Sequence, residues 1–222
     1  MERNTKVIEF YGLPGGGKTT VCEHLLDSDK RCVKINEVMK RYGQETILYK
    51  ILHLPIKKWV SFTNFLLSLP DKKKNSRDEY FTFYYQILAY SYCTVKMKDS
   101  ILVMDHGLLQ QLGSILHNLD FYITNKSLNK FRKFLQTMQT LRIIYCQLPE
   151  NEALRRMRLR KRDAGRIDAV MSDTDFAISL LEKERNLFDK CYNTNKEIVE
   201  ILDMKKSREE LLSCVSAMLT ET

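Results

Sequence analysis

Short apolar runs alternate with longer amphipathic stretches along this chain. The runs are rich in Val, Ile, Leu, Phe and Tyr, and a short apolar run bounded by polar segments is typical of a buried strand. Five such strands are predicted, at 6–11, 32–35, 101–105, 142–148 and 198–203. Strands that alternate with helices are typical of a parallel sheet covered on both faces. The pattern therefore predicts an α/β fold built on a five-stranded parallel sheet.

The longest segment between two predicted strands covers 44–99. We expect two or more helices there, separated by Pro70 and by a charged stretch over 71–79 that is typical of an exposed linker or mobile loop. At 222 residues the chain suits a single domain, 1–222, that is long enough to bury a core.

A glycine-rich loop follows the first predicted strand. Gly12, Gly17, Lys18 and Thr19 fit the spacing G-x-x-x-x-G-K-[ST] of the phosphate loop, also called Walker A. Such a loop turns its backbone N–H groups toward an anion at a helix N-terminus, the lysine reaches the β- and γ-phosphates of ATP, and the hydroxyl holds Mg²⁺. The residues expected to bind the nucleotide are Gly12, Gly15, Gly16, Gly17, Lys18, Thr19 and Thr20.

A glycine-rich turn that merely precedes a lysine is the alternative. The flanking segments favour the phosphate loop, because an apolar strand precedes it and the apolar positions Val21, Leu25 and Leu26 after it fall on one helix face. The chain is also too short for a phosphate-loop unit with an elaborate partner domain.

Two acids follow predicted strands at the edge of the sheet where ligands bind. Glu37 follows the second strand and Asp105 ends the third, and ligands of open parallel sheets lie beyond the carboxyl ends of the strands. Asp105 is a candidate Mg²⁺ ligand and Glu37 a candidate general base for an acceptor hydroxyl. Either acid alone is equally well explained as a surface residue or a helix cap, and which of the two is the base stays open.

The net charge of +8 is unevenly distributed. Residues 155–166 contain seven cationic residues and one acid, whereas the rest is nearly neutral, so a general nucleic-acid surface is not indicated. A helix over 150–163 would place Arg156 and Arg160 four residues apart on one face, with an apolar side of only Leu154, Met157 and Leu159. So basic a helix is either a solvated surface, a nuclear-localisation signal or a lid over an anion; the phosphate loop favours a lid, over about 150–170.

Cysteine usage and the chain start predict the compartment. The six cysteines show no C-x-x-C spacing and are interpreted as core thiols of a reducing cytosol. The start Met1-Glu2-Arg3-Asn4 has no apolar segment, and no apolar run approaches the roughly 20 residues of a membrane span. We therefore expect a cytoplasmic protein without signal peptide or membrane contact.

Taken together, these motifs resemble the nucleoside and nucleotide kinases, in particular the deoxynucleoside kinase and thymidylate kinase group. The lid of that family, R-x-x-x-R-x-R followed by acids, is matched by Arg156, Arg160, Arg162 and Asp163. The resemblance implies a P-loop three-layer sandwich with sheet order 2-3-1-4-5, Glu37 as general base, and an adenine-binding loop that starts at Asp203. It also implies ATP and Mg²⁺ as cofactors and a small-molecule acceptor such as a nucleoside or nucleotide. The acceptor side would be formed by about 44–99, and a homodimer is compatible with the resemblance.

This chain departs from the family on the acceptor side. It has Asp105-His106-Gly107 where the family has Glu-Arg-Ser or Asp-Arg-Tyr, and the role of His106 in place of that arginine stays open. The family's Phe-x-x-Gln element, which reads the base, is only similar here, with Gln86 displaced. The aromatic residues at 80, 81, 83, 84 and 85 fit an acceptor pocket and a core equally well.

The favoured function is an ATP-dependent kinase for a small hydroxyl or phosphate acceptor. A GTP-dependent switch would need the guanine motif Asn-Lys-x-Asp. The chain contains Asn-Lys at 125–126 and at 195–196, but in neither case is Asp the fourth residue. Two further functions are compatible with the motifs: a polynucleotide-end kinase, and a P-loop ATP-binding module or ATPase that acts on a nucleic acid or protein partner.

Overall fold

The structure is a computed structural model that describes residues 7–35, 37–38, 56–69, 77–96, 99–117, 120–138, 140–160 and 172–220. The strands are β1 (Val7–Tyr11), β2 (Cys32–Lys34), β3 (Ile101–Met104), β4 (Leu141–Gln147) and β5 (Val199–Asp203). Each lies within one residue of the range that the hydrophobic pattern predicts, so the five predicted strands are confirmed.

Helices lie between successive strands and after the last one. They are α1 (Lys18–Ser28), α3 (Ile56–Leu66), α4 (Arg77–Lys96), α5 (Leu108–His117), α6 (Asn125–Gln136), α7 (Glu150–Leu159), α8 (Thr174–Thr194) and α9 (Arg208–Thr220). Two or more helices are expected in the longest gap, and α3 and α4 lie there. Because α4 begins at Arg77, the predicted linker over 71–79 is wrong for its last three residues; Pro70 and 71–76 lie outside the described residues.

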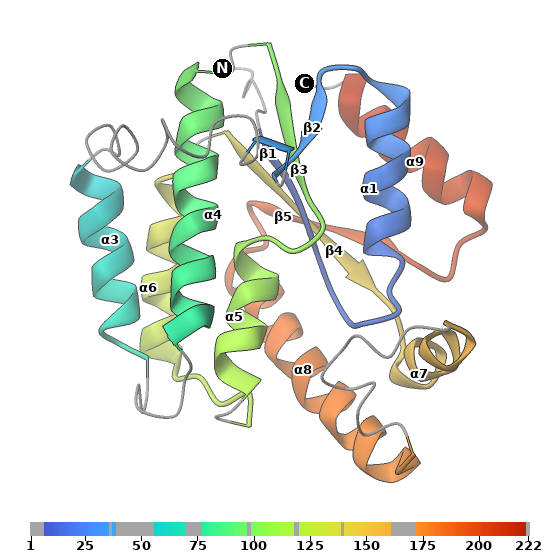
Figure 1. Cartoon of the computed structure of the whole chain (residues 1–222). Coiled ribbons are helices and arrows are strands. Elements are labelled where there is room, and N and C mark those ends of the chain that lie inside the picture. Colours follow the sequence, from blue (N-terminus) through green and yellow to red (C-terminus); the bar gives the residue numbers. More distant parts are fainter. Residues whose placement is uncertain are drawn as a thin grey trace.

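The strands form one parallel sheet in the order β2-β3-β1-β4-β5 (Figure 1). Strand β1 is central: Val7 is opposite Leu102 of β3 and Leu141 of β4. The expected order 2-3-1-4-5 is thus confirmed. Because all the strands are parallel, their carboxyl ends lie at one edge, where a ligand site is expected.

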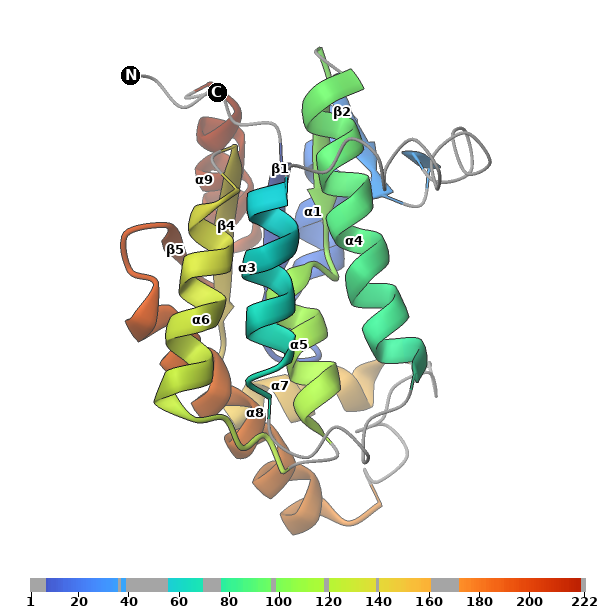
Figure 2. The ribbon, with the colours of Figure 1, turned by 90° about the vertical axis from the view of Figure 1, so that its left-hand side faces the viewer.

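Helices cover both faces of this sheet. Helices α1 and α9 pack together on one face, whereas α4 and α5 pack together on the other (Figure 1). Helix α3 packs against α6 outside α4 and α5, which Figure 2 shows from the side. Helix α8 packs against both α5 and α6 and contributes buried residues to the core.

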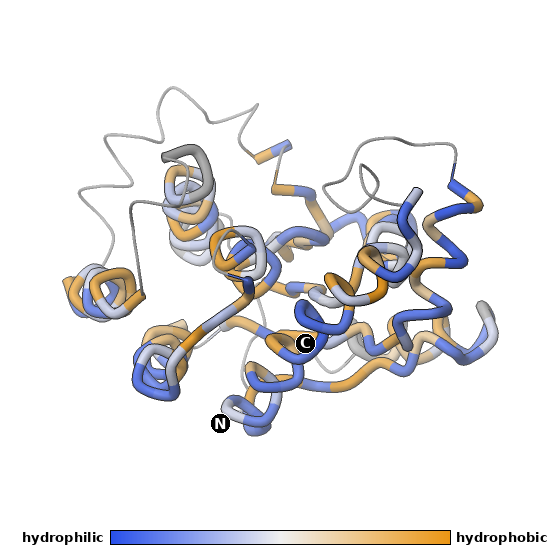
Figure 3. The backbone as a smooth tube through the Cα atoms, turned by 90° about the horizontal axis from the view of Figure 1, so that it is seen from below, coloured by the Kyte–Doolittle hydropathy of each residue, from blue (hydrophilic) through white to orange (hydrophobic). Residues whose placement is uncertain are grey.

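The burial of the elements follows from their residue patterns. All five residues of β1 are buried, as expected for a central strand with helices on both faces. Helix α6 buries Leu128, Phe131 and Phe134 on one side and leaves its lysines outside. In Figure 3 the helices alternate between hydrophilic and hydrophobic stretches along the tube, as amphipathic helices do.

Four cysteines, at 22, 32, 146 and 191, are buried free thiols, which confirms them as core residues; Cys214 is only half-buried. Among the described residues no helix is both long enough and apolar enough to span a membrane.

Candidate functional site

The loop between β1 and α1 has a conformation that requires glycine at two positions. Gly12 has φ +145°, and a Cβ there would lie 2.4 Å from the backbone oxygen of Cys146 in β4. Gly15 has φ +79°, and its Cβ would lie 2.7 Å from the backbone oxygen of Ala153 in α7. Both distances are too short for a Cβ atom, so only glycine at these two positions lets the loop pack tightly between β4 and α7.

Helix α1 opens directly out of this loop without a side-chain cap. Its N-cap is Gly17, in the left-handed conformation, and its first turn contains no acid. The N–H groups of Lys18, Thr19 and Thr20 precede the first helical hydrogen bond, which Val21 donates to Gly17. A helix start of this kind favours an anion, because the free N–H groups and the helix dipole both attract negative charge.

Lys18 lies inside the loop and is only 8% exposed. Its Nζ donates hydrogen bonds to the backbone oxygens of Gly12 at 2.7 Å and Leu13 at 2.9 Å. Burial lowers the pKa of the Lys18 ammonium, whereas Cys146, Glu184 and Asp105 act in the opposite direction. The loop therefore holds its cation at the entrance of the helix.

The structure brings Asp105 and Thr19 together. Asp105 directly follows β3, which neighbours β1 in the sheet, and its Oδ2 accepts a hydrogen bond of 3.0 Å from Thr19 Oγ1. A carboxylate and a hydroxyl beside a phosphate loop are hard oxygen donors, which fits Mg²⁺, because Mg²⁺ is usually held by one or two protein oxygens together with phosphates.

The two acceptor-side candidates take no part in the hydrogen bond between Thr19 and Asp105. Glu37 is exposed beyond β2 and makes no hydrogen bond or ion pair with another described residue. His106, next to Asp105, is also exposed, and its backbone oxygen accepts a hydrogen bond from Gln86 Nε2. The pKa of the His106 side chain lies below its ordinary value. Partial desolvation is the main cause and the positive charge of Lys18 the second, and both outweigh the opposite effect of the Asp105 carboxylate.

The aromatic residues of α4 divide between the two interpretations that the sequence leaves open. Phe83 is fully buried and packs against Phe62 and Phe65, so it belongs to the core. Phe81 is 64% exposed, and Tyr84 is half-buried against Trp59. Phe81 and Tyr84 are therefore accessible to a ligand, whereas Phe83 is not.

Helix α7 is shorter than the sequence predicts. It ends at Leu159, and Arg160 is its C-cap with an extended backbone at φ −81° and ψ 126°. The predicted helix to 163 is therefore wrong at Arg160, and so is the shared helix face of Arg156 and Arg160; 161–163 lie outside the described residues. Leu159, predicted to be on the apolar side, is 70% exposed; Arg162 lies outside the described residues.

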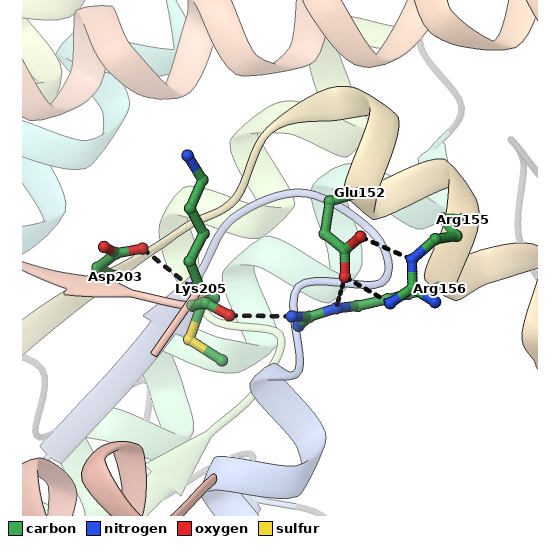
Figure 4. A network of polar contacts seen from close by, with 6 residues as sticks. Glu152, Arg155, Arg156, Asp203 and Lys205 are labelled. Carbon is green, nitrogen blue, oxygen red and sulfur yellow. Dashed lines mark hydrogen bonds and ion pairs between the residues drawn. The ribbon is translucent and has the colours of Figure 1, made fainter. Parts of the chain in front are cut away.

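The two described lid arginines have different surroundings. Arg156 donates to Glu152 Oε1 at 2.8 Å and to the backbone oxygen of Met204 at 3.0 Å (Figure 4). Hydrogen bonds from Arg155 and then Arg156 lower the pKa of Glu152 to about 2. The guanidinium of Arg160, in contrast, is exposed and makes no hydrogen bond or ion pair with another described residue, although the Arg160 backbone N–H donates to the Met157 oxygen at 3.0 Å.

The turn between β5 and α9 lies against the phosphate loop. Asp203 is exposed at the end of β5, and its Oδ1 accepts a hydrogen bond of 3.0 Å from Lys205 N–H (Figure 4). The Met204 side chain packs on Gly17, because a Cβ on Gly17 would lie 2.9 Å from Met204 Cε. Arg156 thus links α7 to the turn that the family resemblance associates with adenine.

Sequence reasoning missed a buried polar group behind the loop. Glu9, in the middle of β1, is 0% exposed, and its Oε1 accepts a hydrogen bond of 2.6 Å from Leu109 N–H in α5. Gln110 Oε1 accepts one of 3.2 Å from Gly12 N–H, and Gln110 Nε2 donates to Glu184 at 3.4 Å. The one available signal was the acid inside an otherwise apolar strand.

We predict that Glu9→Gln changes the pH dependence of stability. Desolvation raises the pKa of Glu9 from 4.5 to about 7 against the lowering effect of the α5 backbone hydrogen bonds. Between these values the unfolded chain is ionised while the folded one keeps its proton, so the free energy of unfolding falls as pH rises. Relative to Glu9→Gln, the wild type should lose up to about 3 kcal/mol from pH 4.5 to 7 and nothing further above it.

Urea unfolding of both proteins at several pH values measures this difference. Because the comparison is between two proteins that differ in one group, titrations elsewhere cancel. A difference that does not change with pH would show that Glu9 is already ionised in the folded state throughout this range.

A parallel sheet in the order 2-3-1-4-5, with a G-x-x-x-x-G-K-T loop between its first strand and first helix, defines a P-loop α/β fold. No protein-family model matches the chain, and no curated protein matches it. Solved structures of deoxyadenosine kinase from M. mycoides are similar in fold: with bound dCTP (TM-score 0.47, 14% identity), with the products dCMP and dCDP (0.46, 15%) and with bound dATP (0.47, 13%). Each alignment covers 97% of this chain and 100% of the other, and at these identities the likeness concerns the fold alone.

Proposed function

We propose that this chain is an ATP-dependent kinase that transfers the γ-phosphate of ATP to a small acceptor, a nucleoside or a nucleotide. One observation carries this proposal: a buried lysine, an uncapped helix start and the 3.0 Å contact between Thr19 and Asp105 meet at the carboxyl edge of the sheet. A cation, free N–H groups and hard oxygen donors are together what a Mg²⁺-bound triphosphate requires.

On the nucleotide side, the loop N–H groups and Lys18 would bind the β- and γ-phosphates. Thr19 and Asp105 would hold Mg²⁺, which neutralises phosphate charge when bound. The turn that starts at Asp203 would bind the base, and its packing against Gly17 supports this placement, because base and phosphates of one nucleotide need neighbouring sites.

On the acceptor side, we assign Glu37 as the general base. It follows β2, and β2 lies beyond β3 in the sheet, so Glu37 and Asp105 follow neighbouring strands at the same edge. An exposed carboxylate there would accept the proton of an acceptor hydroxyl as the oxygen attacks the γ-phosphorus. Arg160, Arg162 and Arg156 would supply positive charge around the transferring group and the nucleotide.

Label transfer from γ-labelled ATP to a panel of nucleosides and nucleotides, with Mg²⁺, tests the proposal. We expect transfer to at least one acceptor, and that acceptor at 100 times its dissociation constant should stabilise the fold by about 2.7 kcal/mol. If ATP hydrolysis occurs at a rate that none of these compounds changes, the chain is instead an ATPase that acts on a nucleic acid or protein partner.

We predict distinct losses for the two acids. Glu37→Gln should lower turnover by about 10²-fold or more with ATP affinity little changed, because only proton removal is lost. Asp105→Asn should instead weaken the Mg²⁺-dependent part of ATP binding, whatever the acceptor. Glu197→Gln, at the opposite end of the sheet in an ion pair with Arg132, is the matched control. Equal loss of ATP affinity in both variants would place Glu37 in the metal site.

A further inference from the structure

Two chain units meet at the candidate site. One consists of β1, the phosphate loop and α1, and the other of β3 and α5, with Asp105 in the short connection between them. Asp105 lies between Met104 of β3, which pairs with Glu9 of β1 in the sheet, and the first turn of α5, so its position relative to Thr19 depends on that turn as well as on the sheet. A residue that fixes the first turn of α5 would therefore also help to position the proposed Mg²⁺ ligands Thr19 and Asp105.

Glu9 holds the turn from the side of β1. Its Oε1 accepts the Leu109 N–H, and the backbone N–H groups of Leu108 and Gln110 also face its carboxyl group. The chain passes directly over this carboxyl at Gly107, where a Cβ would lie 2.2 Å from Glu9 Cδ. Gly107 offers no side chain to cap α5, so the cap comes from a strand 100 residues earlier in the chain.

Gln110 makes a second connection in the same turn. Its Oε1 accepts the N–H of Gly12, the first glycine of the phosphate loop, and the contact is buried. Beyond the pairing of β1 with β3 in the sheet, three hydrogen bonds thus join the two units, Glu9 to Leu109, Gly12 to Gln110 and Thr19 to Asp105. The first two are buried, and the third is exposed at the site.

We propose that Glu9 is a positioning residue, which fixes the first turn of α5 so that Asp105 and Thr19 share one Mg²⁺ ion. This rests on the proposed function, since it assigns these two residues to Mg²⁺. A buried acid with one carboxyl oxygen that has no partner among the described residues is an expensive way to cap a helix. An ordinary local cap would not connect α5 to β1, the strand that leads into the phosphate loop, whereas Glu9 does.

The test compares Glu9→Leu, which removes the hydrogen-bond acceptor, with Glu9→Gln, which keeps a carbonyl oxygen for Leu109 N–H. Calorimetry measures the factor by which Mg²⁺ tightens binding of a non-hydrolysable ATP analogue. Loss of a group that orients a metal ligand typically weakens metal affinity by about 10- to 100-fold. We expect that factor to fall by about 10-fold or more in Glu9→Leu, with Mg²⁺-free affinity nearly unchanged, and to stay within about 3-fold of wild type in Glu9→Gln.

Two further variants complete the test. Val199→Ala removes a buried side chain at the far end of β5 and should leave the Mg²⁺ effect unchanged, which separates positioning from loss of stability. Gly107→Ala keeps Glu9 but forces its carboxyl group and the turn apart, whichever of the two moves, since Gly107 has no left-handed backbone and only the collision with Glu9 opposes a methyl group. It should reproduce the loss seen in Glu9→Leu, and it decides the question if Glu9→Leu does not fold.

A wild-type Mg²⁺ effect in folded Glu9→Leu, or in Gly107→Ala, would overturn the positioning role. The proposed kinase activity fails separately, if the wild type binds the Mg²⁺ nucleotide but transfers phosphate to no small acceptor. In that case the binding measurement still decides the role of Glu9.

Discussion

Lys18→Met should reduce phosphoryl transfer by about 10³-fold or more and weaken triphosphate binding. The ammonium lies at the entrance of α1, where charge on the β- and γ-phosphates increases during transfer, and no other described cation reaches the loop carbonyls of Gly12 and Leu13. Methionine keeps most of the side-chain volume in this buried position. The variant should remain folded, because the lost hydrogen bonds are offset by removal of a desolvated charge.

Steady-state kinetics and analogue binding, with circular dichroism to verify folding, measure this effect. Lys126→Met, on the exposed side of α6 and away from the loop, is the matched control. Wild-type turnover and ATP affinity in Lys18→Met would falsify the assignment of the phosphate loop.

Arg160→Ala is expected to lower turnover by about 10³-fold, with a much smaller effect on ATP affinity. Its guanidinium is exposed at the C-terminal end of α7 and makes no hydrogen bond or ion pair with another described residue, so its charge is available for the transferring phosphoryl group. An arginine of this kind acts mainly in the transition state. The free energy of unfolding should change by no more than about 0.5 kcal/mol, as for other surface substitutions.

Two neighbouring variants sharpen this test. Arg155→Ala removes an equally exposed guanidinium that is paired with Glu152, and it should leave turnover unchanged. Arg156→Ala should mainly weaken ATP binding, because Arg156 is bonded to the backbone of Met204 in the turn after β5. If Arg160→Ala and Arg155→Ala are equally active, α7 is only a solvated basic helix.

The sequence predicted the elements that depend on local patterns. The strands were located within one residue, since a buried parallel strand is a nearly continuous apolar run and few other segments of this chain have one. The G-x-x-x-x-G-K-T loop was predicted from its spacing together with the flanking strand and helix, because its pattern lies within eight consecutive residues. The sheet order followed from the family resemblance and not from the pattern.

The end of α7 was not predictable in the same way. Its cationic i, i+4 pattern continues past Arg160, and a pattern of charges does not show where a helix leaves the surface that supports it. The structure ends the helix where its buried face, with Ala153, Leu154 and Met157, ends. Arg156 consequently has partners in Glu152 and Met204, whereas the Arg160 guanidinium has none among the described residues, although their spacing alone made them equivalent.

By itself, then, the sequence determined where the strands lie along the chain and where the G-x-x-x-x-G-K-T loop lies, because both depend on neighbouring residues. Only the tertiary structure decided which residues meet across the sheet. It placed Asp105 against Thr19, and it placed Glu9 under a helix start 100 residues away. Such contacts depend on how parallel strands are ordered and in which register they pair, and no local pattern specifies the partner of a buried polar group.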